Sequence, residues 1–154
     1  MDDLILVKHA KGAPGLRLLG LGSKLYPLKG INQLQNLMIQ NTFWANNRTR
    51  EDIRKMLRAS PVIVSVWDGK NIIGFGRATT DQIYRAVLWD IVVDKNYQKR
   101  GIGKAIVENI LIDPLLSKVE KIYLMTSDFE AFYSKMGFIK EDKKTLMMLK
   151  KPPR

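Results

Sequence analysis

The chain contains no cysteine and only one histidine, His9, among its 154 residues. Without thiols it has no thiolate nucleophile, no disulfide framework and no cysteine ligands for iron–sulfur clusters, and a single imidazole excludes nearly every structural zinc site. A bound metal ion would need carboxylate ligands alone, so we predict no metal site. His9 lies in a segment without a recognisable motif, and a lone histidine of this kind is more often a surface side chain than a catalyst.

Long apolar runs are also missing. The chain opens MDDLILVKHAKG, with two acids where a secretory signal carries positive charge, and this apolar run ends at Lys8. The longest stretch without charge, residues 30–47, carries eight asparagine or glutamine side chains, which a spanning helix would not accommodate. We therefore expect an intracellular protein with no membrane span.

Positive charge is abundant. The 26 Lys and Arg residues exceed the 15 Asp and Glu residues, for a formal net charge of +11, which predicts attraction to nucleic acid, anionic lipid or a phosphate-bearing cofactor. A chain of this length with 45% hydrophobic residues can bury a core without disulfide or metal staples. We expect one domain over residues 1–154, with an irregular glycine-rich segment at 1–30 and a core at 31–150.

The first half of the core predicts two helices and a hairpin. Apolar residues recur at helical spacing over 31–43, and again after Asn47 or Thr49, either of which is a suitable cap. Pro61 ends this pattern, and two β-prone runs follow, joined by the turn signal Asp68-Gly69.

The second half alternates strands and helices. Residues 86–94 are too continuously apolar for a half-exposed strand, which places them inside a sheet. Ser127 and Glu130 have the spacing of a capping box for the last helix. The remaining elements are expected as a helix from 102 to near Pro114, a strand at 121–126, a helix at 130–136 and closing strands at 138–140 and 145–150. The order predicts an α/β (α+β) domain with a mixed, mostly antiparallel, twisted sheet and helices on both faces.

The strongest local signal is the segment Gln98–Gly103 (QKRGIG), which joins a strand to a helix. Its two glycines let backbone N–H groups approach an anion at the positive end of the helix, and Lys104 adds further positive charge. Two familiar phosphate motifs fail here, because Ile106 breaks the pattern GxGxxG and Ala105 stands where a P-loop has Ser or Thr. Taken alone, the segment also fits a tight structural turn.

The string VVDKNYQKRGIGKA, residues 92–105, resembles the pyrophosphate-binding motif of the GNAT superfamily of N-acetyltransferases, with Gln98, Gly101 and Gly103 at its defining positions. Residues 132–138, FYSKMGF, are similar to the family's second signature, FYxxxGF. The two motifs occur in the family's order, and the resemblance covers roughly residues 30–150. GRATTD followed by LWDIVVD most resembles the cyanobacterial and plastid group related to plant serotonin N-acetyltransferase.

This resemblance implies a GNAT-like fold that uses acetyl-coenzyme A as cosubstrate. The acetyl group would pass by direct attack in a ternary complex to a primary amine: an arylalkylamine such as serotonin, or a protein lysine or N-terminus. It also implies a location in the cytoplasm or the plastid stroma.

The resemblance further implies which residues hold the cofactor. The strand residues would offer backbone groups to the pantetheine arm, the glycine turn would hold the pyrophosphate, and Tyr133 would protonate the departing thiolate. The implied cofactor-binding set is Ile91, Val92, Val93, Gln98, Lys99, Arg100, Gly101, Ile102, Gly103, Lys104 and Tyr133. Judged without the family match, Val92 and Val93 fit a buried core, and Tyr133 fits ordinary aromatic packing.

The acceptor amine must lose a proton before it attacks, so we expect a carboxylate as general base. Some relatives place a glutamate on the strand before the tyrosine helix, but residues 124–126 here read Leu-Met-Thr. Asp90 is the candidate base, followed by Asp81 and Asp128. A polar interior Asp is also often structural, and deprotonation through water is an open alternative.

Two other classes of protein fit parts of the sequence. The basic run from Arg48 to Arg58 is compatible with a nucleic-acid-binding module, although aromatic residues do not alternate with the charges there. The chain also fits a domain that binds an acyl-coenzyme A without reacting.

Overall fold

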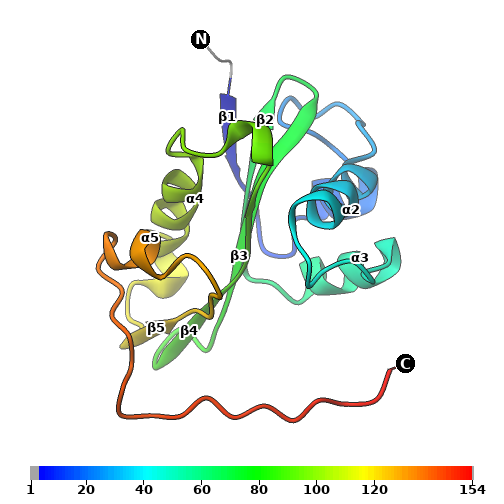
Figure 1. The fold of residues 1–154 in the computed structure, drawn as a ribbon. Coiled ribbons are helices and arrows are strands. Elements are labelled where there is room, and N and C mark those ends of the chain that lie inside the picture. Colours follow the sequence, from blue (N-terminus) through cyan, green and yellow to red (C-terminus); the bar gives the residue numbers. More distant parts are fainter. Residues whose placement is uncertain (1–3, 154) are drawn as a thin grey trace.

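Five strands form one mixed sheet in the computed structural model, which describes residues 4–153. They lie in chain order, and every neighbouring pair is antiparallel except β4 and β5, which are parallel (Figure 1). The strands are β1 (Leu4–Lys8), β2 (Val62–Asp68), β3 (Asn71–Thr80), β4 (Arg85–Val93) and β5 (Lys121–Tyr123). The expected mixed, mostly antiparallel sheet is confirmed.

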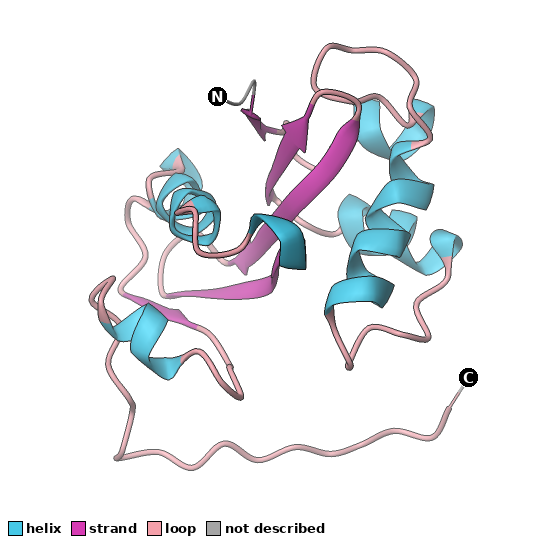
Figure 2. Cartoon of the chain, turned by 45° about the horizontal axis from the view of Figure 1, so that its top comes forward, coloured by secondary structure: helices cyan, strands magenta, loops and turns pink. Residues whose placement is uncertain are grey.

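Helices cover both faces of this sheet (Figure 1, Figure 2). One face carries α1 (Pro14–Leu19), α2 (Gly30–Asn41) and α3 (Arg50–Arg58), and the other carries α4 (Ile102–Leu111) and α5 (Glu130–Ser134). Two short 3-10 turns, η1 (Lys95–Tyr97) and η2 (Pro114–Leu116), flank α4.

The two faces of β2 show why the sheet is buried on both sides. Ile63 and Trp67 belong to the apolar cluster under α1–α3, whereas the alternate residues Val64 and Val66 belong to the cluster under α4. Side chains along a strand point alternately to opposite faces, so a strand between two helical layers needs an apolar residue at nearly every position. This requirement explains the run VIVSVW, in which Ser65 is the single polar residue.

Local signals fixed the ends of several elements as expected. The Thr49 side chain accepts a hydrogen bond from the Asp52 N–H at 3.1 Å and caps α3. Gly69, at φ +54°, forms the turn between β2 and β3, where a left-handed conformation suits glycine.

The pairing of β3 with β4 contains a one-residue bulge. Phe75 pairs with Val92 and Arg77 with Trp89, so Gly76 alone lies opposite both Asp90 and Ile91. Asp90 adopts φ +56°, a left-handed conformation that costs a non-glycine residue on the order of 1 kcal/mol. A Cβ on Gly76 would come within 2.7 Å of Ile91, so glycine makes the room that the bulge requires.

The bulge exchanges the faces of β4. Before it, Leu88 packs in the cluster under α4, and after it Val92 packs in the cluster under α1–α3, although both residue numbers are even. One extra residue in a strand has this effect because side chains alternate with a period of two. The direction of the last residues of β4 therefore depends on the bulge.

Two expectations for the helices were wrong. Residues 14–19 form the short helix α1, where the glycine-rich composition favoured a loop or an irregular strand. Ser127 does not cap α5: the N-cap is Phe129, which makes no side-chain cap bond, and its own N–H donates to Thr126 Oγ1 at 3.1 Å.

The closing strands expected at 138–140 and 145–150 are also absent from the described chain. This tail has no helix or strand and stands apart from the sheet, running beneath it in Figure 1. The side chains of Leu146, Met147, Met148 and Leu149 are 74–87% exposed. The apolar β-prone pattern is present in the sequence, but within residues 4–153 the tail pairs with no strand, and neither does the outer edge of β5.

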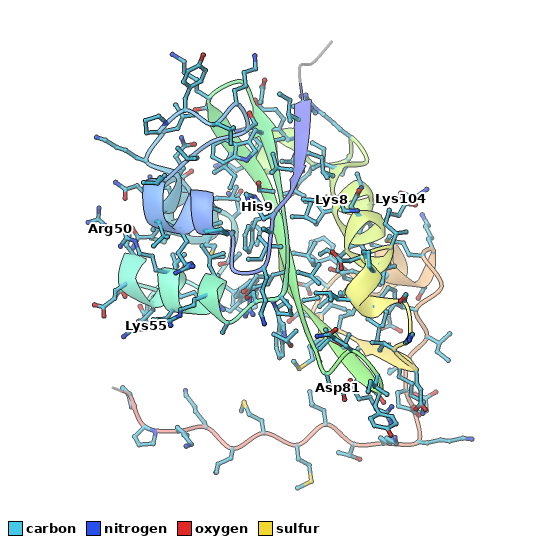
Figure 3. All side chains as sticks on the ribbon, turned by 180° about the vertical axis from the view of Figure 1, so that it is seen from behind. Lys8, His9, Arg50, Lys55, Asp81 and Lys104 are labelled. Atoms are coloured by element: carbon cyan, nitrogen blue, oxygen red, sulfur yellow. The ribbon has the colours of Figure 1, made fainter. Side chains whose placement is uncertain are left out.

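His9 is not a surface side chain. Its Nε2 lies 2.7 Å from Ser65 Oγ, which also accepts a hydrogen bond from Trp67 Nε1 at 2.8 Å. Figure 3 shows His9 on the α1–α3 side of the sheet. Because Ser65 accepts from the indole, its hydroxyl proton is free to point at a neutral imidazole, and burial lowers the pKa of His9 to about 4.

This network predicts a pH-dependent stability. The unfolded chain binds a proton at His9 near pH 6.5 and the folded chain only near pH 4, so the contribution is complete above pH 6.5 and is lost as the pH falls. Between pH 7 and pH 4, the free energy of unfolding should fall by about 2–3 kcal/mol more in the wild type than in His9→Gln. Urea unfolding at a series of pH values measures this difference, and parallel curves for the two proteins would contradict it.

Candidate functional site

A cavity of about 880 Å³ opens where β4 and β5 separate. The two strands pair only as far as Val87 and Tyr123, and beyond this point the residues that follow on each line the cavity from opposite sides. Its volume lies within the range of pockets that enclose a small molecule or a cofactor. The lining comes from residues 41–44 at the end of α2, Arg48, residues 88–93 of β4, the turn and first residues of α4, residues 124–129, Phe132, Tyr133 and Leu146.

The N-terminus of α4 forms one end of the cavity. Gly101 is the N-cap at φ +80° and supplies no side-chain cap bond, so no side chain satisfies the first backbone N–H groups of this ten-residue helix. These groups and the positive end of the helix dipole favour an anion. Lys99 and Lys104 line the same region and add positive charge.

Two further contacts fix this turn against the sheet. Gln98 Nε2 donates to the backbone oxygen of Val93 at 3.2 Å, which ties the turn to the end of β4. A Cβ on Gly103 would lie 3.4 Å from the Phe132 ring, so helix α4 approaches α5 closely at this glycine.

The structure brings nearly all of the predicted site residues to this cavity. Asp90 and the residues expected to bind the cofactor line it, namely Ile91, Val92, Val93, Gln98, Lys99, Gly101, Ile102, Gly103, Lys104 and Tyr133. Arg100 is the exception, because its guanidinium lies over the Tyr97 ring, 5.2 Å from the centroid, and does not line the cavity.

Tyr133 stands on α5 at the edge of the cavity. Its ring packs edge-to-face against Phe132 and Phe138, with centroids 4.9 and 5.9 Å apart. Burial raises the pKa of the Tyr133 phenol to about 12. The hydroxyl therefore stays protonated at any pH at which the protein would work, and it can donate a proton.

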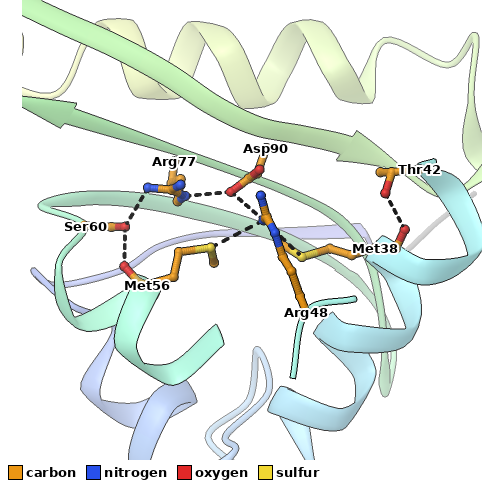
Figure 4. Close-up of polar contacts among 7 residues, drawn as sticks. All are labelled: Met38, Thr42, Arg48, Met56, Ser60, Arg77 and Asp90. Atoms are coloured by element: carbon orange, nitrogen blue, oxygen red, sulfur yellow. Dashed lines mark hydrogen bonds and ion pairs between the residues drawn. The ribbon is translucent and has the colours of Figure 1, made fainter. Parts of the chain in front are cut away.

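Asp90 is held by two arginines on the opposite side of the cavity (Figure 4). Its Oδ2 lies 2.7 Å from Arg77 Nε and 3.0 Å from Arg48 Nη1, and its side chain is only 4% exposed. Arg77 comes from β3, next to the bulge, whereas Arg48 comes from the connection between α2 and α3. A smaller recess of about 380 Å³ shares Arg48 and Trp44 with the large cavity.

The other two candidate carboxylates differ in position. Asp128 lines the cavity. Asp81 does not: its Oδ1 accepts hydrogen bonds from the backbone N–H groups of Arg85, Ile83 and Tyr84, which lower the pKa of this carboxyl and fix the β3–β4 turn.

Sequence reasoning missed the wall formed by residues 41–44 and Arg48. The neighbouring aromatic residues Phe43 and Trp44 follow directly after α2 and remain 72% and 47% exposed. Two exposed aromatic rings beside a cavity are typical of a binding surface, and the pair was the available sequence signal. The sequence shows Arg48 only as part of the basic run from Arg48 to Arg58.

Within residues 4–153, no group of three or more His, Asp or Glu side chains is placed to hold a metal ion. No helix of this described part is long and apolar enough to cross a bilayer.

Comparison with known families shows which family the chain belongs to. A family model described as the acetyltransferase (GNAT) domain matches residues 59–140, which include β2, β3, β4, α4 and α5. The chain belongs to the GNAT family. Proteins of this family generally use acetyl-coenzyme A, and the uncapped α4 N-terminus with its lysines suits the phosphates of that donor.

Curated relatives of this GNAT domain include proteins of algae and plants. The chain is 30% identical over 99 residues to "Uncharacterized N-acetyltransferase ycf52" of Pyropia yezoensis, covering 61% of this chain and 57% of that protein. It is 40% identical over 70 residues to "GCN5-related N-acetyltransferase 2, chloroplastic" of Arabidopsis thaliana, covering 45% of this chain and 27% of the relative. The match thus spans less than two thirds of these relatives.

Solved structures share the fold. A putative GNAT acetyltransferase from Xanthomonas campestris superposes with a TM-score of 0.72 at 20% identity, over 99% of this chain and 96% of that one. Glucosamine-6-phosphate N-acetyltransferase from Arabidopsis thaliana superposes with a TM-score of 0.64 at 18% identity, over 97% and 99% of the two chains.

The geometry of the α4 turn predicts the effect of Gly103→Glu. A carboxylate in the first turn of α4 is compatible with the helix dipole, so the protein should fold, but it places negative charge where the donor phosphates would lie. We expect saturable binding of acetyl-coenzyme A by the wild type and its loss in Gly103→Glu, measured by isothermal titration.

Lys70→Gln is the matched control, because it changes the net charge by the same amount at an exposed residue outside the cavity. Equal affinities for the wild type and Gly103→Glu would remove the α4 turn from the binding site.

Proposed function

We propose that this protein transfers the acetyl group of acetyl-coenzyme A to a primary amine by direct attack in a ternary complex. The observation that supports this most is that one cavity joins the uncapped N-terminus of α4, the bulged end of β4 and the protonated phenol of Tyr133. These three features correspond to holding the donor, polarising its thioester and protonating its leaving group.

In this proposal the donor lies along the carboxyl end of β4. The residues from Gln98 to Lys104 bind the diphosphate, and the backbone of Ile91, Val92 and Val93 pairs with the amide-rich pantetheine arm as a strand would. A backbone N–H at Val92 or Val93 then polarises the thioester carbonyl and stabilises the oxyanion. The short pairing of β5 supports this role, since it ends at Val87 and Tyr123 and leaves the other edge of residues 91–93 without a strand partner in the described chain.

The reaction needs no covalent enzyme intermediate. The amine nitrogen forms a bond with the acetyl carbonyl carbon, and the carbon–sulfur bond breaks. Tyr133 gives its phenolic proton to the departing thiolate and regains one from solvent. The chain has no cysteine to carry an acyl group, so holding donor and acceptor together supplies the rate enhancement.

Asp90 is the candidate base for the acceptor amine. Both arginines contact its Oδ2, so the amine proton would go to Oδ1 directly or through water. Asp128 is the alternative carboxylate that lines the cavity.

We infer that the acceptor is an arylalkylamine of the serotonin type. The lining aromatic residues Phe43, Trp44 and Phe129 suit a flat aromatic ring, and Asp128 suits its ammonium group. A protein lysine is the second candidate acceptor, because one relative, 39% identical over 70 residues, is named "Histone acetyltransferase TAP1". The chloroplastic and ycf52 names of other relatives support a location in the plastid.

Tyr133→Phe tests the chemical step. Removing a general acid should lower kcat by about a hundredfold, while the affinity for acetyl-coenzyme A changes little, because the phosphates are held at α4. Release of free thiol in the presence of tryptamine or a lysine peptide measures kcat, and titration measures the affinity.

Tyr84→Phe is the control, since Tyr84 is 58% exposed and lies outside the cavity. An unchanged kcat in Tyr133→Phe would remove Tyr133 from the reaction. Binding of acetyl-coenzyme A without turnover on any amine would instead leave a non-catalytic acyl-coenzyme A-binding domain, and salt-dependent DNA binding without coenzyme binding would favour the nucleic-acid module.

A further inference from the structure

The direction of the last residues of β4 depends on Asp90, which adopts a left-handed backbone conformation that non-glycine residues disfavour. Asp90 holds φ +56° at the bulge, opposite Gly76, and the bulge turns Val92 toward the α1–α3 side. A strained residue of this kind persists only when its surroundings hold it there. Residues 92 and 93 pair with β3, and the contacts of the Asp90 side chain hold the bulge that sets their direction.

Two contacts hold that side chain, and they come from different parts of the fold (Figure 4). Arg77 belongs to β3, so its ion pair at 2.7 Å stays within the sheet. The Arg77 guanidinium also donates to Ser60 Oγ at 3.3 Å and lies over the Trp89 ring, 5.8 Å from the centroid. Arg48 adds the second ion pair, at 3.0 Å, from outside the sheet.

Arg48 is itself fixed by its neighbours. Its Nη1 lies 3.8 Å from Met38 Sδ and 3.6 Å from Met56 Sδ, and its guanidinium lies over the Trp44 ring, 5.3 Å from the centroid. Gln35 Nε2 donates to its backbone oxygen at 3.0 Å. Arg48 thus connects α2, α3 and the aromatic wall of the cavity to the carboxylate at the bulge.

We propose that Arg48 is a positioning residue for acetyl transfer, which acts through Asp90 to hold the β4 bulge so that the backbone of Ile91–Val93 faces the acetyl group. The expected effect of Arg48 on the rate of acetyl transfer rests on the proposed function, whereas its expected effect on the backbone position of residues 91–93 does not. The arrangement also links the two substrates, because the same guanidinium lines the wall beside Trp44 and anchors the donor strand.

Arg48→Met tests this proposal in the full chain. Methionine keeps an unbranched apolar side chain beside Met38 and Met56 and removes the guanidinium together with its contacts to Asp90 and to the two sulfur atoms. We expect kcat to fall about ten- to a hundredfold, because a small misplacement of the oxyanion donors is sufficient for such a loss, with little change in KM for acetyl-coenzyme A. Arg48→Lys should recover much of kcat, since an ammonium can still pair with Asp90.

Arg50→Met is the matched control, because Arg50 is exposed, donates to Asn32 Oδ1 at 3.2 Å and lies outside both cavities. It should leave kcat unchanged. In an Asp90→Asn background, Arg48→Met should cause little further loss, since two residues that act through one contact are not additive. Full additivity of the two losses would overturn the proposal.

A measurement without the acceptor separates this proposal from the proposed function. In ¹⁵N-labelled protein, the backbone amide resonances of Ile91, Val92 and Val93 should shift in Arg48→Met and stay in place in Arg50→Met. Unchanged resonances, or an Arg48→Met variant whose only defect is a raised KM for the amine, would overturn the positioning role. Shifted resonances in a protein that acetylates no amine would support the positioning role and refute the proposed function.

Discussion

The mismatch of one residue between β3 and β4 is the constraint on which the site depends. Gly76 faces both Asp90 and Ile91, so the strand must turn at this point, and the turn aims residues 91–93 into the cavity. The bulge needs glycine on one strand, because any Cβ on Gly76 would meet Ile91, Ile106 and Ile110. It needs a held aspartate on the other, because Asp90 stands in a left-handed conformation. A substitution at Gly76, which does not itself line the cavity, can thus change the direction of the β4 residues that do.

The cavity itself follows from how the sheet ends. β5 pairs with β4 over three residues only, and the two strands then separate, so the space between them is lined by backbone rather than closed by a ladder. The N-terminus of α4 faces this opening because β4, η1 and α4 follow one another with only a short turn between them. A short strand–turn–helix connection therefore places anion-binding N–H groups beside free strand backbone, the combination expected for a long donor with phosphates at one end and amides along its length.

The parts of the site that sequence predicted are those fixed by local geometry. The turn at residues 98–104 needs glycines and a following helix, and both requirements are visible in neighbouring residues. Arg48 was missed because its place in the site depends on its ion pair with Asp90, which is distant in the chain. His9 was misjudged for the same reason, since its burial depends on Ser65 and Trp67 of another strand. The pattern of the tail at 145–150 does favour a strand, but a strand also needs a partner, and the described chain gives it none.

The exchange of faces along β4 affects how this chain can change in evolution. Replacing one residue near the bulge alters one side chain and leaves its neighbours in place. Deleting one residue there would restore regular pairing, and the later side chains of β4 would then point to the opposite faces of the sheet. Val92 would turn to the α4 side, whereas Ile91 and Val93, which now pack on that side, would turn to the α1–α3 side. Insertions and deletions are thus far more restricted between Trp89 and Val93 than substitutions are, and variation in length should accumulate instead in loops such as residues 20–29.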